Sequence, residues 1–230
     1  MKEIITITGL DDEKVGLLDK MCDRLDTKKK NALMRECILE LKSTMEQNDL
    51  VSLSAPQIGY NCRIFCVKLD DRIKAFINPM ITKATGLQLS RETCSSIPNK
   101  TYIRIRHPQI ELHYENPLGK VESATFMGKS AMVVQHCVDH LDGLLLPDVG
   151  LEIDADFDNA TDEERGEIVD AYLSALDLKR AEIHKDIESD AEAKKVSDAM
   201  KFMTAVENGE VTLSDETVTV TRAVDDKDEE

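Results

Sequence analysis

Residues 135–143, Gln-His-Cys-Val-Asp-His-Leu-Asp-Gly, are the most informative stretch of this 230-residue chain. Apolar side chains recur around them at helical spacing, which predicts a helix over residues 129–141 that ends at the Asp-Gly pair. His136 and His140 then lie about 40° apart on one face of that helix, where both imidazoles can reach one metal ion. Two histidines four residues apart also occur by chance. The pair alone therefore indicates either a metal site or two histidines without a shared function.

A cysteine supplies the third candidate ligand. Cys94 lies in the polar segment Glu-Thr-Cys-Ser-Ser at residues 92–96, which we predict to be a loop ahead of a strand. One thiolate and two imidazoles form a ligand set for Zn²⁺ or Fe²⁺ and leave a fourth position open for water. Because structural zinc sites usually have four protein ligands, the open position is typical of a catalytic metal.

The rest of the first 150 residues predicts a mixture of helices and strands. Residues 11–48 carry two helical patterns that are separated by the lysines at 28–30. Residues 51–125 contain short apolar runs typical of strands, and Asn78-Pro79 is expected to end one of them.

Charge divides the chain into two regions. Residues 1–150 have 20 basic and 20 acidic side chains, whereas residues 151–230 have 9 basic and 25 acidic ones, so the net charge of −16 arises in the second region. We expect a metal-binding domain over 1–152 and an acidic, mostly helical extension over 153–230. The acidic balance argues against nucleic acid as the main partner, because phosphates require a basic surface. The extension packs on the domain, self-associates or docks to a basic partner, and the sequence does not choose among these alternatives.

The extension has its own local pattern. Thr161 and Glu164 fit a capping box at a helix start, and apolar residues continue at near-helical spacing to residue 206. Residues 218–222 alternate like a short strand, and the acidic residues 225–230 are expected to be disordered.

The sequence contains no export signal and no apolar run of 18 residues, so we expect a cytoplasmic protein without a membrane span. The six cysteines are then expected to be reduced thiols or metal ligands. Cys62 and Cys66 flank an apolar run and are expected to be small core residues.

Three motifs resemble those of the peptide deformylases. Residues 135–143 are similar to the family's helix Gln-His-Glu-x-Asp-His-Leu-Asp-Gly, and residues 92–96 to its Glu-Gly-Cys-Leu-Ser segment. Residues 50–59 resemble its Gly-x-Gly-x-Ala-Ala-Pro-Gln-Ile-Gly loop. The motifs occur in the family's order, and the resemblance covers roughly residues 10–150. It implies an α+β fold with antiparallel sheets around a central metal-binding helix, to which the acidic extension is added.

The resemblance implies a metal centre and a substrate. Cys94, His136 and His140 would hold one divalent ion, with Fe²⁺ expected in the cell and Zn²⁺ or Ni²⁺ as alternatives. The implied substrate is an N-formylmethionyl peptide or the N-terminus of a nascent chain, and the products are formate and a free amino group.

The resemblance also implies roles around the metal. The side-chain amide of Gln57 and the backbone N–H of Ser95 would stabilise the oxyanion that forms when water attacks the formyl carbon. Arg106 matches a family arginine that pairs with the acidic residue of the helix, here Asp139.

This chain differs from the family pattern at the position of the general base. Cys137 occupies the position of the glutamate that takes a proton from the attacking water, and losing a general base typically lowers a rate by about 10² to 10⁴. A thiol can shuttle a proton, but the cysteine side chain is shorter than that of glutamate. Ser52, Ser54 and Thr93 replace small residues near the expected substrate position, where their side chains would reshape the cleft.

Several interpretations of position 137 stay open. The chain is a weakly active or altered hydrolase, or it is an inactive relative that keeps the metal and binds peptide N-termini. A further alternative is that Cys94 and Cys137 form a disulfide, or that Cys137 becomes a fourth metal ligand and closes the site. A last alternative is that Cys137 was introduced in the laboratory to silence or probe an active enzyme.

Overall fold

A computed structural model describes residues 2–7, 12–27, 32–172, 174, 211–214 and 217–220. It contains two compact units. The first unit consists of Met1–Thr85 and Arg91–Glu152, and the second of Gly86–Ser90 and Ile153–Glu230. All of the predicted site residues lie in the first unit.

The segment predicted to be helical at 11–48 forms two helices, α1 (Asp12–Leu18) and α2 (Ala32–Gln47). The described residues between them are not helical. There, the Cys22 N–H donates to the carbonyl oxygen of Leu141 at 2.8 Å. This hydrogen bond to a distant part of the chain takes the place of an intrahelical one, so a tertiary contact ends the helical pattern early.

The first sheet has five antiparallel strands in the order β1-β2-β3-β6-β7. Its strands are β1 (Ser52–Ser54), β2 (Ile64–Leu69), β3 (Arg72–Thr85), β6 (Gln109–Glu115) and β7 (Val121–Met127). A short 3₁₀ helix, η1 (Ala55–Ile58), follows β1. Cys66 lies within β2 and Cys62 just before it, and both are buried, which confirms the prediction that they are core residues.

The prediction that Asn78-Pro79 ends a strand is wrong, because β3 continues to Thr85. Asn78 has a φ of 48°, and the pairing of β3 with β6 shifts register between Ile77 and Met80. The Asn78 side chain accepts from and donates to the segment between α1 and α2, at 2.9 and 2.8 Å. These contacts hold a bulge, which tolerates a proline that has no N–H for the ladder.

The second sheet brings Cys94 into place. It contains β4 (Leu87–Cys94), β5 (Ile97–Arg106) and β8 (Leu151–Ile153), with β5 between the other two. Cys94 is therefore the last residue of a strand, and the prediction of a loop is wrong. Glu92 and Cys94 are buried whereas Arg91 and Thr93 are exposed, because successive side chains of a strand point to opposite faces.

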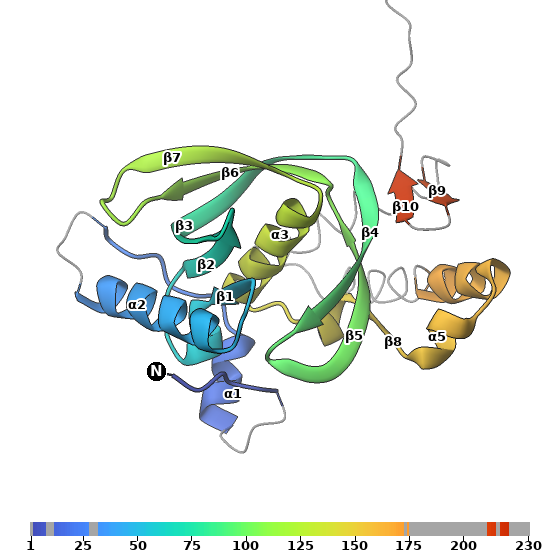
Figure 1. Cartoon of the computed structure of the whole chain (residues 1–230), viewed down its shortest axis with the longest axis horizontal. Helices are drawn as coiled ribbons and strands as arrows, with labels where there is room; N and C mark the ends of the chain where they lie inside the picture. Colours follow the sequence, from blue (N-terminus) through green and yellow to red (C-terminus); the bar gives the residue numbers. More distant parts are fainter. Residues whose placement is uncertain are drawn as a thin grey trace, which may run out of the picture. The chain divides into compact units, whose positions relative to one another are not determined.

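Helix α3 (Lys129–Leu141) confirms the predicted central helix and its end. Figure 1 shows it in the middle of the first unit, and it packs against β1, β2 and β7. Gly143 follows with a φ of 69°, and a Cβ at this position would lie 2.7 Å from the backbone of Lys20. Glycine is thus required both by conformation and by space. Helix α4 (Leu146–Val149) comes next.

In the second unit, α5 (Ala155–Asn159) precedes a helical segment over 162–172. The capping box is confirmed: Glu164 accepts from the Thr161 N–H at 2.7 Å, and the Glu164 N–H donates to the Thr161 hydroxyl at 3.3 Å. Strands β9 (Val211–Ser214) and β10 (Thr217–Val220) pair with each other, and β10 also pairs with the first residues of β4.

Two predictions for the extension, the helix continuing to residue 206 and the disordered end over 225–230, fall mostly or wholly outside the described residues. In the described part of the chain, none of the helices combines the length and apolar character that crossing a membrane requires.

Candidate metal centre

The three predicted metal ligands lie together. Cys94 comes from the end of β4, and His136 and His140 come from α3, four positions apart. Their ligand atoms all lie within 4.8 Å of one another, and Cys94 Sγ is 3.2 Å from His140 Nε2. Two elements far apart in sequence therefore converge on one point.

Charge at this point favours a thiolate. Burial raises the pKa of Cys94, but hydrogen bonds with His136 and His140 outweigh it and lower that pKa to about 5. Burial lowers the pKa of His136, but hydrogen bonds with Cys94 and Glu92 outweigh it and raise that pKa to about 9. A deprotonated sulfur beside imidazoles is the form that a divalent metal binds.

The donor set fits a divalent metal ion. The Nδ1 of His136 lies 3.0 Å from a carboxylate oxygen of Glu92, which leaves its Nε2 for a metal. A carboxylate on the second ring nitrogen is the usual partner of a metal-binding histidine, because it fixes the ring and its tautomer. His140 Nδ1 is buried, and among the described residues it has no hydrogen-bond partner.

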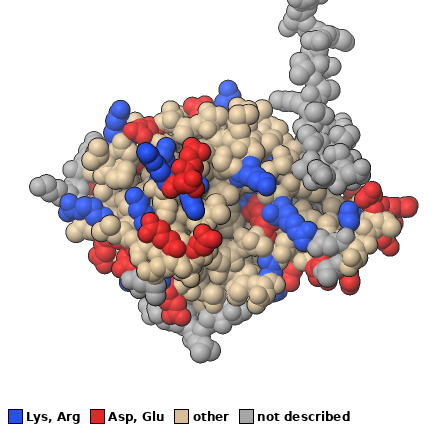
Figure 2. Space-filling model, viewed as in Figure 1, with Lys and Arg blue, Asp and Glu red and all other residues tan. Residues whose placement is uncertain are grey.

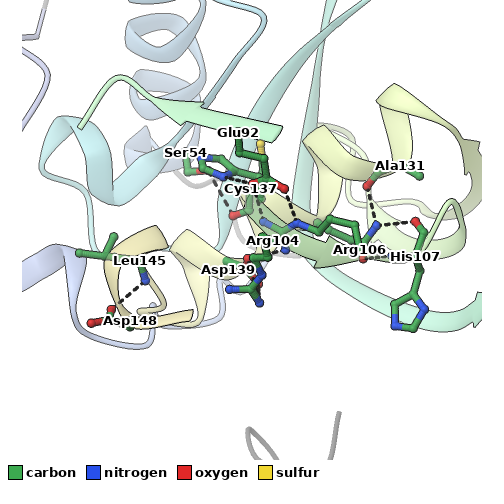
Figure 3. Close-up of polar contacts among 12 residues, drawn as sticks. Ser54, Glu92, Arg104, Arg106, His107, Ala131, Cys137, Asp139, Leu145 and Asp148 are labelled. Carbon is green, nitrogen blue, oxygen red and sulfur yellow. Dashed lines mark hydrogen bonds and ion pairs between the residues drawn. The ribbon is translucent and has the colours of Figure 1, made fainter. Parts of the chain in front are cut away.

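Glu92 belongs to a buried network of charged side chains. Arg106 donates to both carboxylate oxygens of Glu92 at 2.7 and 2.8 Å, and to Asp139 at 2.6 Å (Figure 3). The predicted contact between Arg106 and Asp139 is thus present. Arg104 also reaches Asp139, at 3.4 Å. Burial raises the pKa of Glu92, but hydrogen bonds from Arg106 and His136 outweigh it and hold that pKa well below its usual range.

Sequence reasoning did not predict a role for Glu92. The available signal was its position two residues before Cys94, because residues two apart in a strand share a face. A carboxylate on the same face as a predicted ligand is a candidate to orient the other ligands.

We expect Glu92→Gln to weaken metal binding by about 10- to 100-fold, because His136 loses its charged partner. Competition with a chromophoric chelator measures this affinity in purified protein. Glu111→Gln is a matched control, because this carboxylate is 40% exposed and hydrogen-bonds His113, away from the metal ligands. Equal affinities of the Glu92 and Glu111 variants would contradict the orienting role.

Gln57, in η1, directs its side-chain amide toward the group of metal-ligand candidates. Its Oε1 accepts from the Ser54 N–H at 2.9 Å, which directs its Nε2 toward the end of β4. There the Nε2 lies 3.1 Å from the Ser96 hydroxyl, 3.2 Å from the Ser95 hydroxyl and 3.7 Å from Cys94 Sγ. The arrangement places a neutral hydrogen-bond donor beside the ligand group.

Comparison with known proteins agrees with this geometry. The family model for polypeptide deformylase matches residues 4–152. The chain belongs to the peptide deformylase family. A curated deformylase from Dictyoglomus turgidum is 34% identical over 149 residues, which cover 65% of this chain and 94% of the relative.

Solved deformylase structures share the fold. The crystal structure from Thermotoga maritima matches with a TM-score of 0.58 and 28% identity, over 65% of this chain and 97% of that one. The deformylase from Synechococcus elongatus, solved in complex with actinonin, matches with a TM-score of 0.57 and 25% identity, over 64% and 80% of the two chains.

Cys137, at the position of the deformylase glutamate, is 1% exposed and lies in an apolar cluster with neighbours such as Phe65 and Val134. Burial raises the pKa of its thiol to about 12, although hydrogen bonds with Ser52 and Ser54 oppose the change. All six cysteines are free, and Cys137 is not a member of the ligand group. The structure therefore gives no support to a disulfide with Cys94 or to a fourth protein ligand.

The residues expected near the substrate differ in accessibility. Ser52 and Ser95 are half-buried and Thr93 is exposed. Ser54 is fully buried, and its hydroxyl donates to the carbonyl oxygen of Cys137 at 3.2 Å. Ser54 thus joins β1 to α3, whereas substrate contact by Ser52 and Thr93 stays a prediction.

We expect Cys94 of the metal-free protein to titrate near pH 5 instead of its ordinary 9, because both histidines stabilise the thiolate. The thiolate absorbance at 240 nm, taken as the difference between the wild-type protein and Cys94→Ser, should be present at pH 7 and disappear on acidification through that midpoint. A difference that develops only above pH 8 would contradict the prediction.

Proposed function

We propose that this chain removes the formyl group from N-formylmethionyl peptides by metal-dependent hydrolysis, and that it does so slowly. The observation that carries the proposal is the convergence of Cys94, His136 and His140 on one point. These three side chains would hold one divalent ion, with Fe²⁺ as the expected metal and Zn²⁺ or Ni²⁺ as alternatives. Such an ion acts as a Lewis acid toward water and the formyl oxygen.

Gln57 and Ser95 would stabilise the negative charge that develops on the formyl oxygen. The Gln57 amide cannot rotate freely, because the Ser54 N–H fixes its oxygen. A donor that is already oriented needs no reorganisation when charge develops, and one such donor is typically worth about 10²- to 10³-fold in rate. The backbone N–H of Ser95, at the end of β4, would be the second donor.

Slow turnover follows from Cys137. At neutral pH its buried thiol, with a pKa of about 12, is protonated and cannot accept a proton from water. Proton transfer is then left to solvent or to other groups. The substrate class comes from the family, and the complex of the Synechococcus elongatus relative with actinonin supports a ligand-binding role for this fold.

Formate release from formyl-Met-Ala-Ser by metal-loaded protein tests the proposal. We expect measurable turnover that His140→Ala reduces to the level of buffer, because a ligand of the metal is lost. His113→Ala is a matched control, since this histidine is 45% exposed on β6 and should leave the rate unchanged. Turnover that persists in His140→Ala would assign the activity to another site or to a contaminant.

A second candidate function is a metal-containing module that binds peptide N-termini without turnover. The replacement of the base by Cys137 favours it. Calorimetric titration with the same formyl peptide separates the two candidates. Binding with no formate release over many hours would support the module, whereas release that depends on His140 would exclude it.

A further inference from the structure

Strand β7 is the outer strand of the first sheet, and among the described residues only β6 pairs with it. The other edge of an outer strand presents unpaired backbone N–H and C=O groups. Proteins commonly protect such an edge with proline, lysine, an inward-pointing charge or a bulge. β7 has seven residues without proline or lysine, and its one charged side chain, Glu122, accepts from Tyr114 and Asn116 of the same hairpin.

The solvent face of this strand is apolar at both ends. Val121 is 69% exposed and Met127 is 66% exposed, with the exposed Ser123 and Thr125 between them. Met80, 51% exposed, lies on the same face, because it pairs with His113 and His113 pairs with Ser123. Two exposed apolar side chains at the ends of an outer strand, with hydroxyl side chains between them, are available to a partner strand that pairs with this edge.

We propose that β7 pairs antiparallel with β7 of a second copy of this chain, in a register centred on Ala124. A two-fold interface requires that one surface be complementary to itself, and the solvent-face residues of β7, Val121, Ser123, Thr125 and Met127, meet this requirement. In this register Val121 faces Met127 of the second copy, and Ser123 faces Thr125. Apolar side chains meet apolar ones and hydroxyls meet hydroxyls, both of which are favourable cross-strand pairs.

The charges near β7 do not oppose the pairing of two copies. The two Glu122 carboxylates do not face each other in this register, because each lies opposite Phe126. Residues 1–150 have 20 basic and 20 acidic side chains, so this part of the chain adds no net repulsion. Figure 2 shows basic and acidic side chains interspersed on the face that it draws. The strongly acidic residues 151–230 would repel, and salt screens such repulsion between exposed charges.

Sedimentation velocity on the full chain tests the register. We expect the wild-type protein to form a reversible dimer. The double variant S123K/T125K places lysine opposite lysine twice in each dimer, so we expect its dissociation constant to rise by about tenfold or more. It also reduces the net charge of −16 by two, which by itself would favour association. S123K/T125E places lysine opposite glutamate, keeps the net charge, and should retain the dimer.

A mixing experiment completes the test. S123K/T125K and S123E/T125E should each be monomeric alone and form a dimer when mixed, because every facing pair then joins opposite charges. Both positions are exposed, so thermal unfolding should stay near the wild-type value. A monomeric wild-type protein would overturn the proposal. So would a dimer that is indifferent to all these variants, and that result would locate self-association elsewhere, for example in the extension.

Discussion

Cys137→Glu is expected to raise the rate of formate release by about 10² to 10⁴, because it supplies the general base that this site lacks. The reason is both geometric and electrostatic. Residue 137 follows the ligand His136 on α3, and its present side chain is a protonated thiol with a pKa of about 12. The ordinary pKa of a glutamate, about 4.3, lies far below that of a thiol, and its side chain is longer by two bonds. The measurement is kcat/KM for formyl-Met-Ala-Ser with the same metal loading in both proteins.

Cys137→Gln is the matched control for this prediction. Glutamine has the same length as glutamate but no basic oxygen at neutral pH, so we expect it to leave the rate near that of wild type. A gain with both variants would indicate a change in packing instead of base catalysis.

The contacts of Cys137 suggest a third variant. The Ser54 hydroxyl donates to the backbone carbonyl oxygen of Cys137, and Ser52 and Ser54 stand where the family has smaller residues. If Cys137→Glu gives no gain, Cys137→Glu with Ser52→Gly provides room for the longer side chain. Failure of both would contradict the view that a missing base limits turnover and would point to the altered segments at 50–54 and 93–95.

The central helix and its two ligands could be predicted because their signal is local. Helical spacing fixes which residues share a face, so His136 and His140 point the same way whatever surrounds them. The third ligand was found through its motif, but its local structure was not. A polar sequence around Cys94 resembles a loop, whereas in the structure alternate residues of that sequence lie on the buried face of β4.

The misjudged features depend on residues distant in sequence. Asn78 bends β3 instead of ending it, because its side chain bonds the segment between α1 and α2, 53 positions away. Glu92 gains its role from Arg106 and His136, which lie on β5 and α3. The local sequence around Glu92 does not indicate which residues will contact its carboxylate. Those contacts depend on how the strands and the helix pack together.

The charge network should be the most sensitive point for stability. We expect Arg106→Leu to lower the free energy of unfolding by about 3–5 kcal/mol, because the buried Glu92 loses its guanidinium partner and Asp139 keeps only the longer contact with Arg104. Arg106 is 2% exposed and contacts both Glu92 and Asp139 at 2.6 to 2.8 Å. Urea unfolding of the metal-free protein at pH 7 measures the change.

Arg104→Leu is the matched control, because Arg104 lies two residues away on β5 and contacts the same Asp139 at 3.4 Å. Its side chain is 16% exposed and Arg106 still pairs with Asp139, so we expect a loss of about 1 kcal/mol or less. Equal losses of unfolding free energy in the two variants would contradict the prediction that Arg106 contributes most to the stability of the network.

The stability of the two proteins should depend differently on pH between 7 and 4. In the wild-type protein the pKa of Glu92 is held below its unfolded value of about 4.3, so its contribution is present above that pH and is lost on further acidification. In Arg106→Leu the buried Glu92 carboxylate, without its guanidinium partner, would take up protons more readily than in the unfolded chain. The variant should therefore recover stability relative to wild type as the pH falls from 7 to 4. A constant difference over this range would show that Arg106 acts through packing alone.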